Sequence, residues 1–393
     1  MPDILSTAPA PAAAVVRSAR IASIDALRGL VILLMLVDHS REFFFYHAQV
    51  SDPMDVAGIA PDLFFARLGA HLCAPIFVAL TGIAACLYAE GKGGAPAASA
   101  FLFKRGLFLV LLELTAVSFA WSFDVTPPIL FLQVIWVIGL SMIALAALVH
   151  LPRAALATIG LVIVFGHNLL DPIQFAPGEP GHIPWAILHD RGFIDLPGGI
   201  RARTSYPLLP WIGVIALGYA AGPWFARGVD ALRRRHRLVM LGAAMLTLFV
   251  VARTINLYGD PLPWNAQETP LRTVMSFLNV TKYPPSMDFL LLTLGVGTLL
   301  LALFEALPSR ATGWLTVFGS VPLFFYLLHL YLLHLLNLAA QAVTGNFSGT
   351  YYGVAQLWQV LAIAALVAVP CWFACRWFAA KKRASGAWWM RYL

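Results

Sequence analysis

Long apolar segments dominate this sequence and limit the folds that it can adopt. Runs of about 17 to 25 residues recur along the 393-residue chain, and each is long enough to cross a bilayer as a helix. Hydrophobic residues make up 60% of the chain and charged residues only 11%, which excludes a soluble domain. The sequence therefore predicts an all-α, polytopic membrane helix bundle. We expect about ten transmembrane helices, at residues 24–46, 68–89, 103–123, 129–149, 154–170, 206–225, 237–256, 287–304, 314–336 and 355–379.

Positive charges fall mainly on one side of this expected bundle. Of the 26 Lys and Arg residues, 18 lie in segments on the side of the N-terminus and eight on the other side. Cytoplasmic segments are enriched in Lys and Arg, so we expect both termini in the cytoplasm. Residues 1–20 would form a flexible cytoplasmic tail, 21–380 the transmembrane bundle and 381–393 a basic cytoplasmic tail. The net charge of +7 is then a topology signal, and we expect no nucleic-acid partner.

The first expected span contains charged residues, which are costly at membrane depth. Helix geometry of 100° and 1.5 Å per residue places Asp25, Arg28 and His39 on one stripe about 20 Å long. Asp38 and Arg41, three residues apart, project from another face, where they can pair. Asp25 and Arg28 can also be read as residues that cap and anchor the helix start. His39 is harder to explain without a function, because an idle imidazole is costly in hydrocarbon.

Other spans carry titratable residues as well. His71 precedes a Cys-Ala-Pro sequence in the second span, near the expected depth of His39. In the ninth span His329 lies as far from the cytoplasmic end as His39 does in the first. His334, about 140° away, cannot face the same site. Glu113 is a lone carboxylate in the third span, for which a hydrogen bond to a neighbouring helix and a catalytic role are both open.

Histidines at membrane depth can bind metal, relay protons or act as general bases. We predict no metal, because no His-x-x-x-His or Glu-x-x-His motif occurs, although ligands on different helices remain open. A base fits better, because an imidazole in the outer half of the membrane, opposite a cationic inner entry, suits a reaction between a cytoplasmic donor and an outside acceptor. Arg28, Lys104 and Arg105 would lie where a phosphate-bearing donor enters.

Four segments together resemble a known family of membrane enzymes. They are SIDALRGLVILLMLVDHSREFFF, RLGAHLCAPIFVALTG, NVTKYPPSMDFLLLTLG and FGSVPLFFYLLHLYLLH, and they are similar to the heparan-α-glucosaminide N-acetyltransferase-like family of transmembrane acyltransferases. The resemblance implies a bundle of about ten or eleven helices. It also implies that an acetyl group passes from cytosolic acetyl-CoA to a sugar amine or hydroxyl across the membrane.

The resemblance leaves two histidines competing for the catalytic role. Lysosomal members use a histidine that follows an aromatic run near the outer end of the first span, and in this sequence His47 follows the aromatic run FFFY. Broader membrane O-acyltransferases have a first-span histidine that acts as base, which favours His39. Arg41 and His71 would stabilise the oxyanion. The expected catalytic residues are His39, His71, Arg41, His47 and His329, and the expected residues for binding acetyl-CoA are Asp25, Arg28, Lys104 and Arg105.

The expected partners follow from this hypothesis. They are membrane lipid, acyl-CoA and an outer-side glycan or glycolipid acceptor, with a homo-oligomer left open. Long outer connections at 47–67, 171–205 and 257–286 favour a role in recognition over a role as simple connections. The Ala-rich N-terminal segment fits a bacterial inner (cytoplasmic) membrane. A proton-coupled transporter or flippase that uses intramembrane His, Asp and Glu is the alternative, and a purely structural role for these residues is a third reading.

Overall fold

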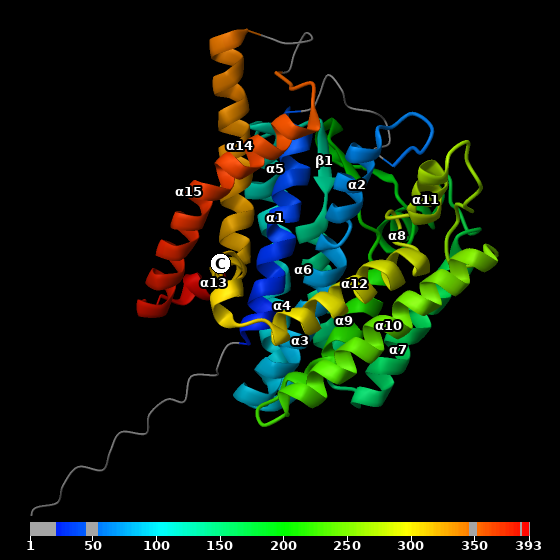
Figure 1. The fold of residues 1–393 in the computed structure, drawn as a ribbon, viewed down its shortest axis with the longest axis vertical. Helices are drawn as coiled ribbons and strands as arrows, with labels where there is room; N and C mark the ends of the chain where they lie inside the picture. The colour runs from blue at the N-terminus through cyan, green and yellow to red at the C-terminus, as the bar shows by residue number, and fades with distance from the viewer. Residues whose placement is uncertain (1–20, 45–53, 346–351, 386, 393) are drawn as a thin grey trace, which may run out of the picture.

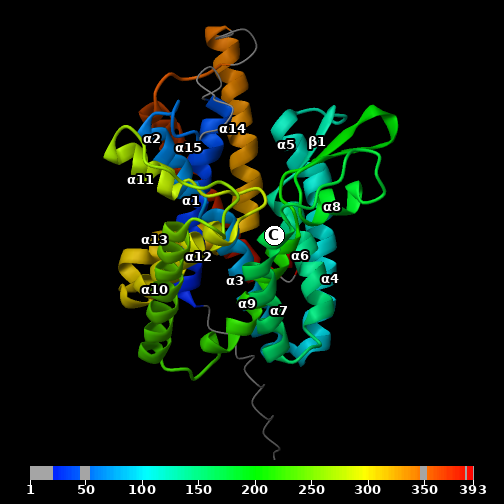
Figure 2. The same cartoon turned by 90° about the vertical axis from the view of Figure 1, so that its right-hand side faces the viewer.

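The computed structural model describes residues 21–44, 54–345, 352–385 and 387–392. The chain is mostly helical (73%), and its helices form a bundle with loops and a small sheet gathered at one end (Figures 1 and 2). We call the end where the first helix begins the α1-start side and the opposite end the α1-end side. The predicted N-terminal tail and His47 lie outside the described residues.

Helices follow one another along most of the chain. They are α1 (Ala22–Phe44), α2 (Pro61–Ala70), α3 (Cys73–Lys92), α4 (Gly94–Leu112), the π-helical turn η2 (Glu113–Val117), α5 (Ser118–Ser122), α6 (Val134–Leu148), α7 (Arg153–Gly166), the 3-10 turn η3 (His167–Leu170), α8 (His182–Leu188), α9 (Leu209–Ala221), α10 (Ala231–Ile255), α11 (Pro270–Leu278), α12 (Met287–Ala306), α13 (Ser309–Gly319), α14 (Pro322–Thr344) and α15 (Leu357–Ala384).

Within the part of the chain that the structure describes, six helical segments are long and apolar enough to cross a membrane, which identifies an integral membrane protein. They are Pro61–Lys92, Arg153–Leu170, Ala231–Ile255, Met287–Ala306, Pro322–Thr344 and Leu357–Ala384. Two further apolar helices are shorter, and α1 carries too many charged side chains to belong to this set. The count of about ten spans and the cytoplasmic position of both termini stay predictions.

Several expected spans are interrupted helices. The second bends between α2 and α3, and the third passes through the π-helical turn η2. The fourth begins as strand β1 (Ile129–Leu132), so its helix starts only at Val134. The ninth is divided into α13 and α14, because Pro322 at the start of α14 cannot donate a backbone hydrogen bond to the preceding turn. Hydropathy detects the apolar runs but does not register these local breaks.

Helix α1 lies at the centre of the bundle and packs against α2, α3, α12, α13, α14 and α15 (Figure 1). Fourteen of its 23 residues are buried. Its closest neighbour is α13, because Gly29 of α1 and Gly319 of α13 carry no Cβ at the crossing. A Cβ on Gly319 would lie 1.8 Å from the carbonyl oxygen of Asp25. The two glycines therefore allow the backbones to touch, as small residues do between membrane helices.

A three-stranded sheet lies at the α1-end side (Figure 2). β1 pairs in parallel with β3 (Arg201–Thr204), and β3 pairs antiparallel with β2 (Phe193–Asp195). The backbone N–H of Ser205, just after β3, donates to the carbonyl oxygen of Leu132 at 3.0 Å. This pairing fixes the position of Tyr206, which lies just before α9.

Candidate active site

A cavity of about 130 Å³ in the centre of the bundle collects polar side chains from distant parts of the chain. Its apolar wall comes mainly from α1, α3, α6 and α14. Charged and polar groups in a cavity between helices are the usual setting for chemistry in a bundle. The polar residues that line it are Asp38, His39, Cys73, Thr81, Arg105, Tyr206, Lys282 and Tyr326.

His39 and His329 are in direct contact. His39 Nδ1 lies 2.7 Å from His329 Nε2, and His329 Nδ1 lies 2.8 Å from the carbonyl oxygen of Phe325, one turn earlier in α14. Because a carbonyl oxygen can only accept, His329 Nδ1 carries a proton. With both rings neutral, His329 Nε2 accepts from His39 Nδ1–H, which leaves the lone pair of His39 on Nε2. His39 Nε2 is thus the nitrogen able to take a proton.

Asp38, the residue before His39, is held between two arginines. It accepts from Arg41 Nε at 3.3 Å, which confirms the predicted pair within α1, and it also accepts from Arg67 of α2. Arg41 is 3% exposed and forms a further ion pair with Glu42. Arg41 is therefore occupied by carboxylates, and the ion cluster joins α1 to α2 beside His39.

Lys282 is the cation that lines the same cavity as His39 on the α1-end side. It is 9% exposed, and its Nζ lies 5.2 Å from the centroid of the Tyr283 ring and 6.0 Å from that of Tyr206. The Tyr283 hydroxyl donates to that of Tyr206 at 3.3 Å. Two aromatic rings therefore hold a buried ammonium group at the cavity wall.

The segment that carries Lys282 is fixed by a second ion cluster. Asp260 accepts from the backbone N–H of Thr281 at 2.7 Å and from the hydroxyl of Ser286 at 2.6 Å. Arg253, which is 2% exposed, donates to main-chain oxygens of the connection between α10 and α12 at 2.7 to 3.0 Å. These contacts supply hydrogen-bond partners to backbone groups of an irregular segment, so Lys282 has a defined position.

The residues expected to bind acetyl-CoA lie toward the α1-start side. Arg105 of α4 lines the cavity and lies within electrostatic range of Arg28. Arg28 donates to Asp25 at 3.2 Å, three residues earlier in α1. Lys104 is exposed. Arg105 is therefore the residue of this group that lines the cavity, and Arg28 is paired with Asp25.

The structure thus brings together only part of the expected set. His39 and Arg105 line one cavity. His329 contacts His39 but does not belong to the described lining of that cavity. The described lining includes neither Arg41 nor His71. His71 is 2% exposed and packs against the ring of Phe289, with ring centroids 5.3 Å apart. Sequence reasoning missed Lys282, although it lies in the NVTKYPP segment, because no helical spacing relates this residue to His39.

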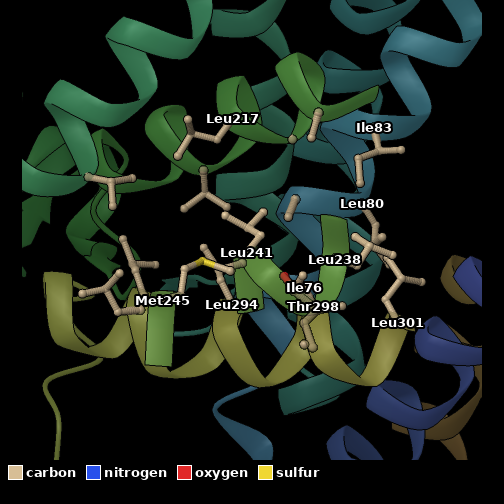
Figure 3. A pocket seen from close by; sticks show the side chains of 18 of the residues that line it. Ile76, Leu80, Ile83, Leu217, Leu238, Leu241, Met245, Leu294, Thr298 and Leu301 are labelled. Atoms are coloured by element: carbon tan, nitrogen blue, oxygen red, sulfur yellow. The ribbon is translucent and has the colours of Figure 1, made fainter. Parts of the chain in front are cut away.

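A larger, apolar cavity of about 380 Å³ lies on the other face of α3 (Figure 3). Side chains of α3, α9, α10 and α12 converge on it, among them Ile76, Leu217, Leu241 and Leu294. Among its described lining residues, only Thr298 and Trp224 carry side-chain hydrogen-bond donors. It has no acid or base, so the polar cavity is the candidate active site.

Comparisons with known proteins identify the family of the chain. No curated protein matches the chain. The family described as heparan-alpha-glucosaminide N-acetyltransferase, catalytic, matches residues 20–259. The match includes α1 with His39 and α4 with Arg105 and covers more than half of the sequence. The chain therefore belongs to the heparan-alpha-glucosaminide N-acetyltransferase catalytic family.

Proposed function

We propose that this protein is a membrane acetyltransferase that passes an acetyl group from acetyl-CoA to an amine or hydroxyl of a sugar. The α1-start side faces the cytoplasm and receives the donor, whereas the glycan or glycolipid acceptor approaches from the α1-end side. One observation carries the proposal: His39, Arg105 and Lys282 line one cavity, so a base and two cations surround the same space. A bacterial cytoplasmic membrane is the proposed location.

In this mechanism His39 acts as general base. Its Nε2 accepts a proton from the acceptor amine or hydroxyl, and the acceptor then attacks the thioester carbonyl of acetyl-CoA. When the tetrahedral intermediate collapses, the carbon–sulfur bond breaks and the proton on Nε2 passes to the leaving thiolate of CoA. His329 orients the ring throughout, because its Nε2 accepts from His39 Nδ1–H.

Lys282 is the proposed stabiliser of the oxyanion. It lines the cavity, and a fixed cation aimed at developing charge lowers the barrier most in a water-poor site. Arg41 and His71, which were expected to do this, act as positioning residues in the proposal. Arg41 holds the Asp38 cluster, and His71, at the end of α2, packs against Phe289 of α12.

Arg105 and Arg28 are the proposed contacts of the CoA phosphates. Guanidinium groups bind phosphate through paired, charge-assisted hydrogen bonds. Removal of one such contact costs a ligand about ten- to hundredfold in affinity. Lys104 is exposed beside Arg105 and adds to the positive field at the entrance.

The test combines binding and turnover on the purified protein in detergent. We expect acetyl-CoA to bind saturably in calorimetry, Arg105→Ala to weaken binding about ten- to hundredfold, and His39→Gln to leave it unchanged. With radiolabelled acetyl-CoA and glucosamine as acceptor, His39→Gln should lower turnover by about 10² to 10⁴. His329→Gln, which retains an oxygen that can accept from His39 Nδ1–H, should keep more activity than His329→Leu.

Matched variants make the test decisive. Arg310→Ala removes an exposed arginine outside the cavity and should change neither measurement. His47→Gln should remain active if His39 is the base, so an inactive His47→Gln beside an active His39→Gln would contradict the assignment. Absence of acetyl-CoA binding in the wild type would overturn the proposed function. The family match does not favour the transporter or flippase alternative.

A further inference from the structure

Three side chains that play no part in the proposed acetyl transfer converge near the α1-end side. His167 begins η3 at the end of α7, Asp171 follows that turn, and His189 follows α8. One nitrogen from each histidine and one oxygen from Asp171 all lie within 4.8 Å of one another. None of the three belongs to the described lining of the cavity that contains His39.

His167 is buried without the hydrogen bonds that an imidazole requires. It is 2% exposed, and among the described residues neither Nδ1 nor Nε2 has a hydrogen-bond partner. The Nδ1 of His189, also 2% exposed, lacks a described partner too. Leaving buried polar groups unpaired is costly, so the ring of His167 calls for a ligand.

Spacing and donor type identify the kind of ligand. His189 Nε2 and Asp171 Oδ1 are 3.0 Å apart. Donors bound to a tetrahedral metal at about 2.0 to 2.1 Å lie roughly 3.3 Å from each other, so small side-chain rotations would complete the arrangement. Two imidazoles with one carboxylate suit Zn²⁺, whereas Mg²⁺ and Ca²⁺ prefer oxygen donors throughout.

Neighbouring residues hold the donors in place. Asn168 Nδ2 donates to Asp171 Oδ2 at 2.9 Å, which leaves Oδ1 on the side of His189. The Oδ1 of Asn168 accepts from the backbone N–H of Met287, at the start of α12, at 2.9 Å. Such outer hydrogen bonds orient the carboxylates of metal sites.

We infer that His167, Asp171 and His189 form a Zn²⁺ site that ties the end of α7 to the segment after α8. Three protein ligands leave a fourth position for water, and the partly exposed Asp171 gives the ion access from the surface. The ion fixes the segment between the two histidines, which leads into β2 and β3.

The experiment measures metal binding directly, on the full chain purified in detergent with an affinity tag that contains no histidine. After treatment with EDTA and removal of the chelator, Zn²⁺ is titrated by calorimetry, and Co²⁺ serves as a spectroscopic probe of a tetrahedral site. We expect one ion per chain in the wild type. His167→Ala, His189→Ala and Asp171→Asn should each weaken binding at least about tenfold.

Controls separate this site from histidines elsewhere. His150→Ala and His236→Ala remove exposed histidines and should bind as the wild type does. Zn²⁺ should raise the Tm of the wild type but not that of His167→Ala, and unchanged acetyl-CoA binding would show that the variants are folded. Absence of Zn²⁺ binding to the wild type, or binding to His167→Ala and His189→Ala as tight as to the wild type, would overturn the inference.

Discussion

At the scale of single residues, the proton-accepting nitrogen of His39 is set by a residue 290 positions later in the chain. The carbonyl of Phe325 fixes the proton on His329, and His329 in turn fixes the proton on His39. Glu113 shows the different case of a buried carboxyl group with a structural role. It accepts from the backbone N–H groups of Gln133 and Trp136, at 3.3 and 3.1 Å, where α6 begins. Glu113 thus caps a helix that has no cap of its own.

His182 leads to a prediction about pH. Its Nδ1 lies 3.1 Å from the carbonyl oxygen of Phe175, and its Nε2 lies 3.0 Å from that of Phe193. Both contacts are hydrogen bonds only when both nitrogens carry protons, so the carbonyls of Phe193 and Phe175 raise the pKa of His182. Protonated His182 therefore stabilises the segment. This stabilisation is complete below the usual histidine pKa of about 6.5 and is lost as the pH rises through the raised pKa of His182.

We therefore expect residues 175–193 to exchange amide hydrogens faster at about pH 9 than at about pH 6, after correction for intrinsic rates. Mass spectrometry of the EDTA-treated protein measures this exchange. His182→Gln should abolish the pH dependence, whereas His150→Gln, at an exposed position in another loop, should retain it. Equal pH dependence in His182→Gln and the wild type would contradict the prediction.

At the scale of elements, the crossing of α1 and α13 sets the position of the first helix, and hence of the residues that it contributes to the cavity. Gly29 and Gly319 meet the partner backbone so closely that an added Cβ would lie 2.0 Å from Leu315 O and 1.8 Å from Asp25 O. Backbone atoms cannot yield as a flexible side chain can, so the helices would have to separate.

Gly319→Ala should accordingly destabilise the protein by about 1 to 3 kcal/mol and lower its Tm in detergent. Gly313→Ala is the matched control on the same helix, because no described atom lies within 4 Å of its added Cβ. It should be neutral or slightly stabilising, since alanine favours helix more than glycine does. Equal Tm values for the two variants would show that the close crossing does not constrain α1.

The sequence predicts much of the helical pattern but little of how the helices meet. The first helix and its Asp38–Arg41 pair follow from local spacing, and the structure confirms both. Hydropathy averages over about 20 residues, so it does not detect the helix breaks before α3 and α14. The position of Lys282 depends on Asp260 and Arg253, which contact its segment from different points of the chain. Neither helical nor strand periodicity predicts such long-range contacts.

At the scale of the whole molecule, α3 separates two cavities of different chemistry. Its Cys73 and Phe77 line the polar cavity, whereas Ile76 and Leu80 line the apolar one. The polar cavity draws its lining from at least five helices and two irregular segments. Sequence reasoning found His39 and Arg105 because each is a charged or titratable group in an apolar run. It could not find Tyr206, because a tyrosine near a helix end is also typical of the membrane interface.

The orientation of the molecule yields a final prediction. Ala231 and Glu268 are both exposed. Ala231 is the first residue of α10, a helix long and apolar enough to cross a membrane, and Glu268 follows the other end of that helix. Four arginines follow Ala231 within the first turns of α10, so this end should face the cytoplasm. In spheroplasts, a membrane-impermeant maleimide should label Glu268→Cys but not Ala231→Cys, and lysis should expose both. Background labelling is expected to be low because the four native cysteines are buried. Labelling of only Ala231→Cys would reverse the proposed donor and acceptor sides, and labelling of both in intact spheroplasts would mean that α10 does not cross the membrane.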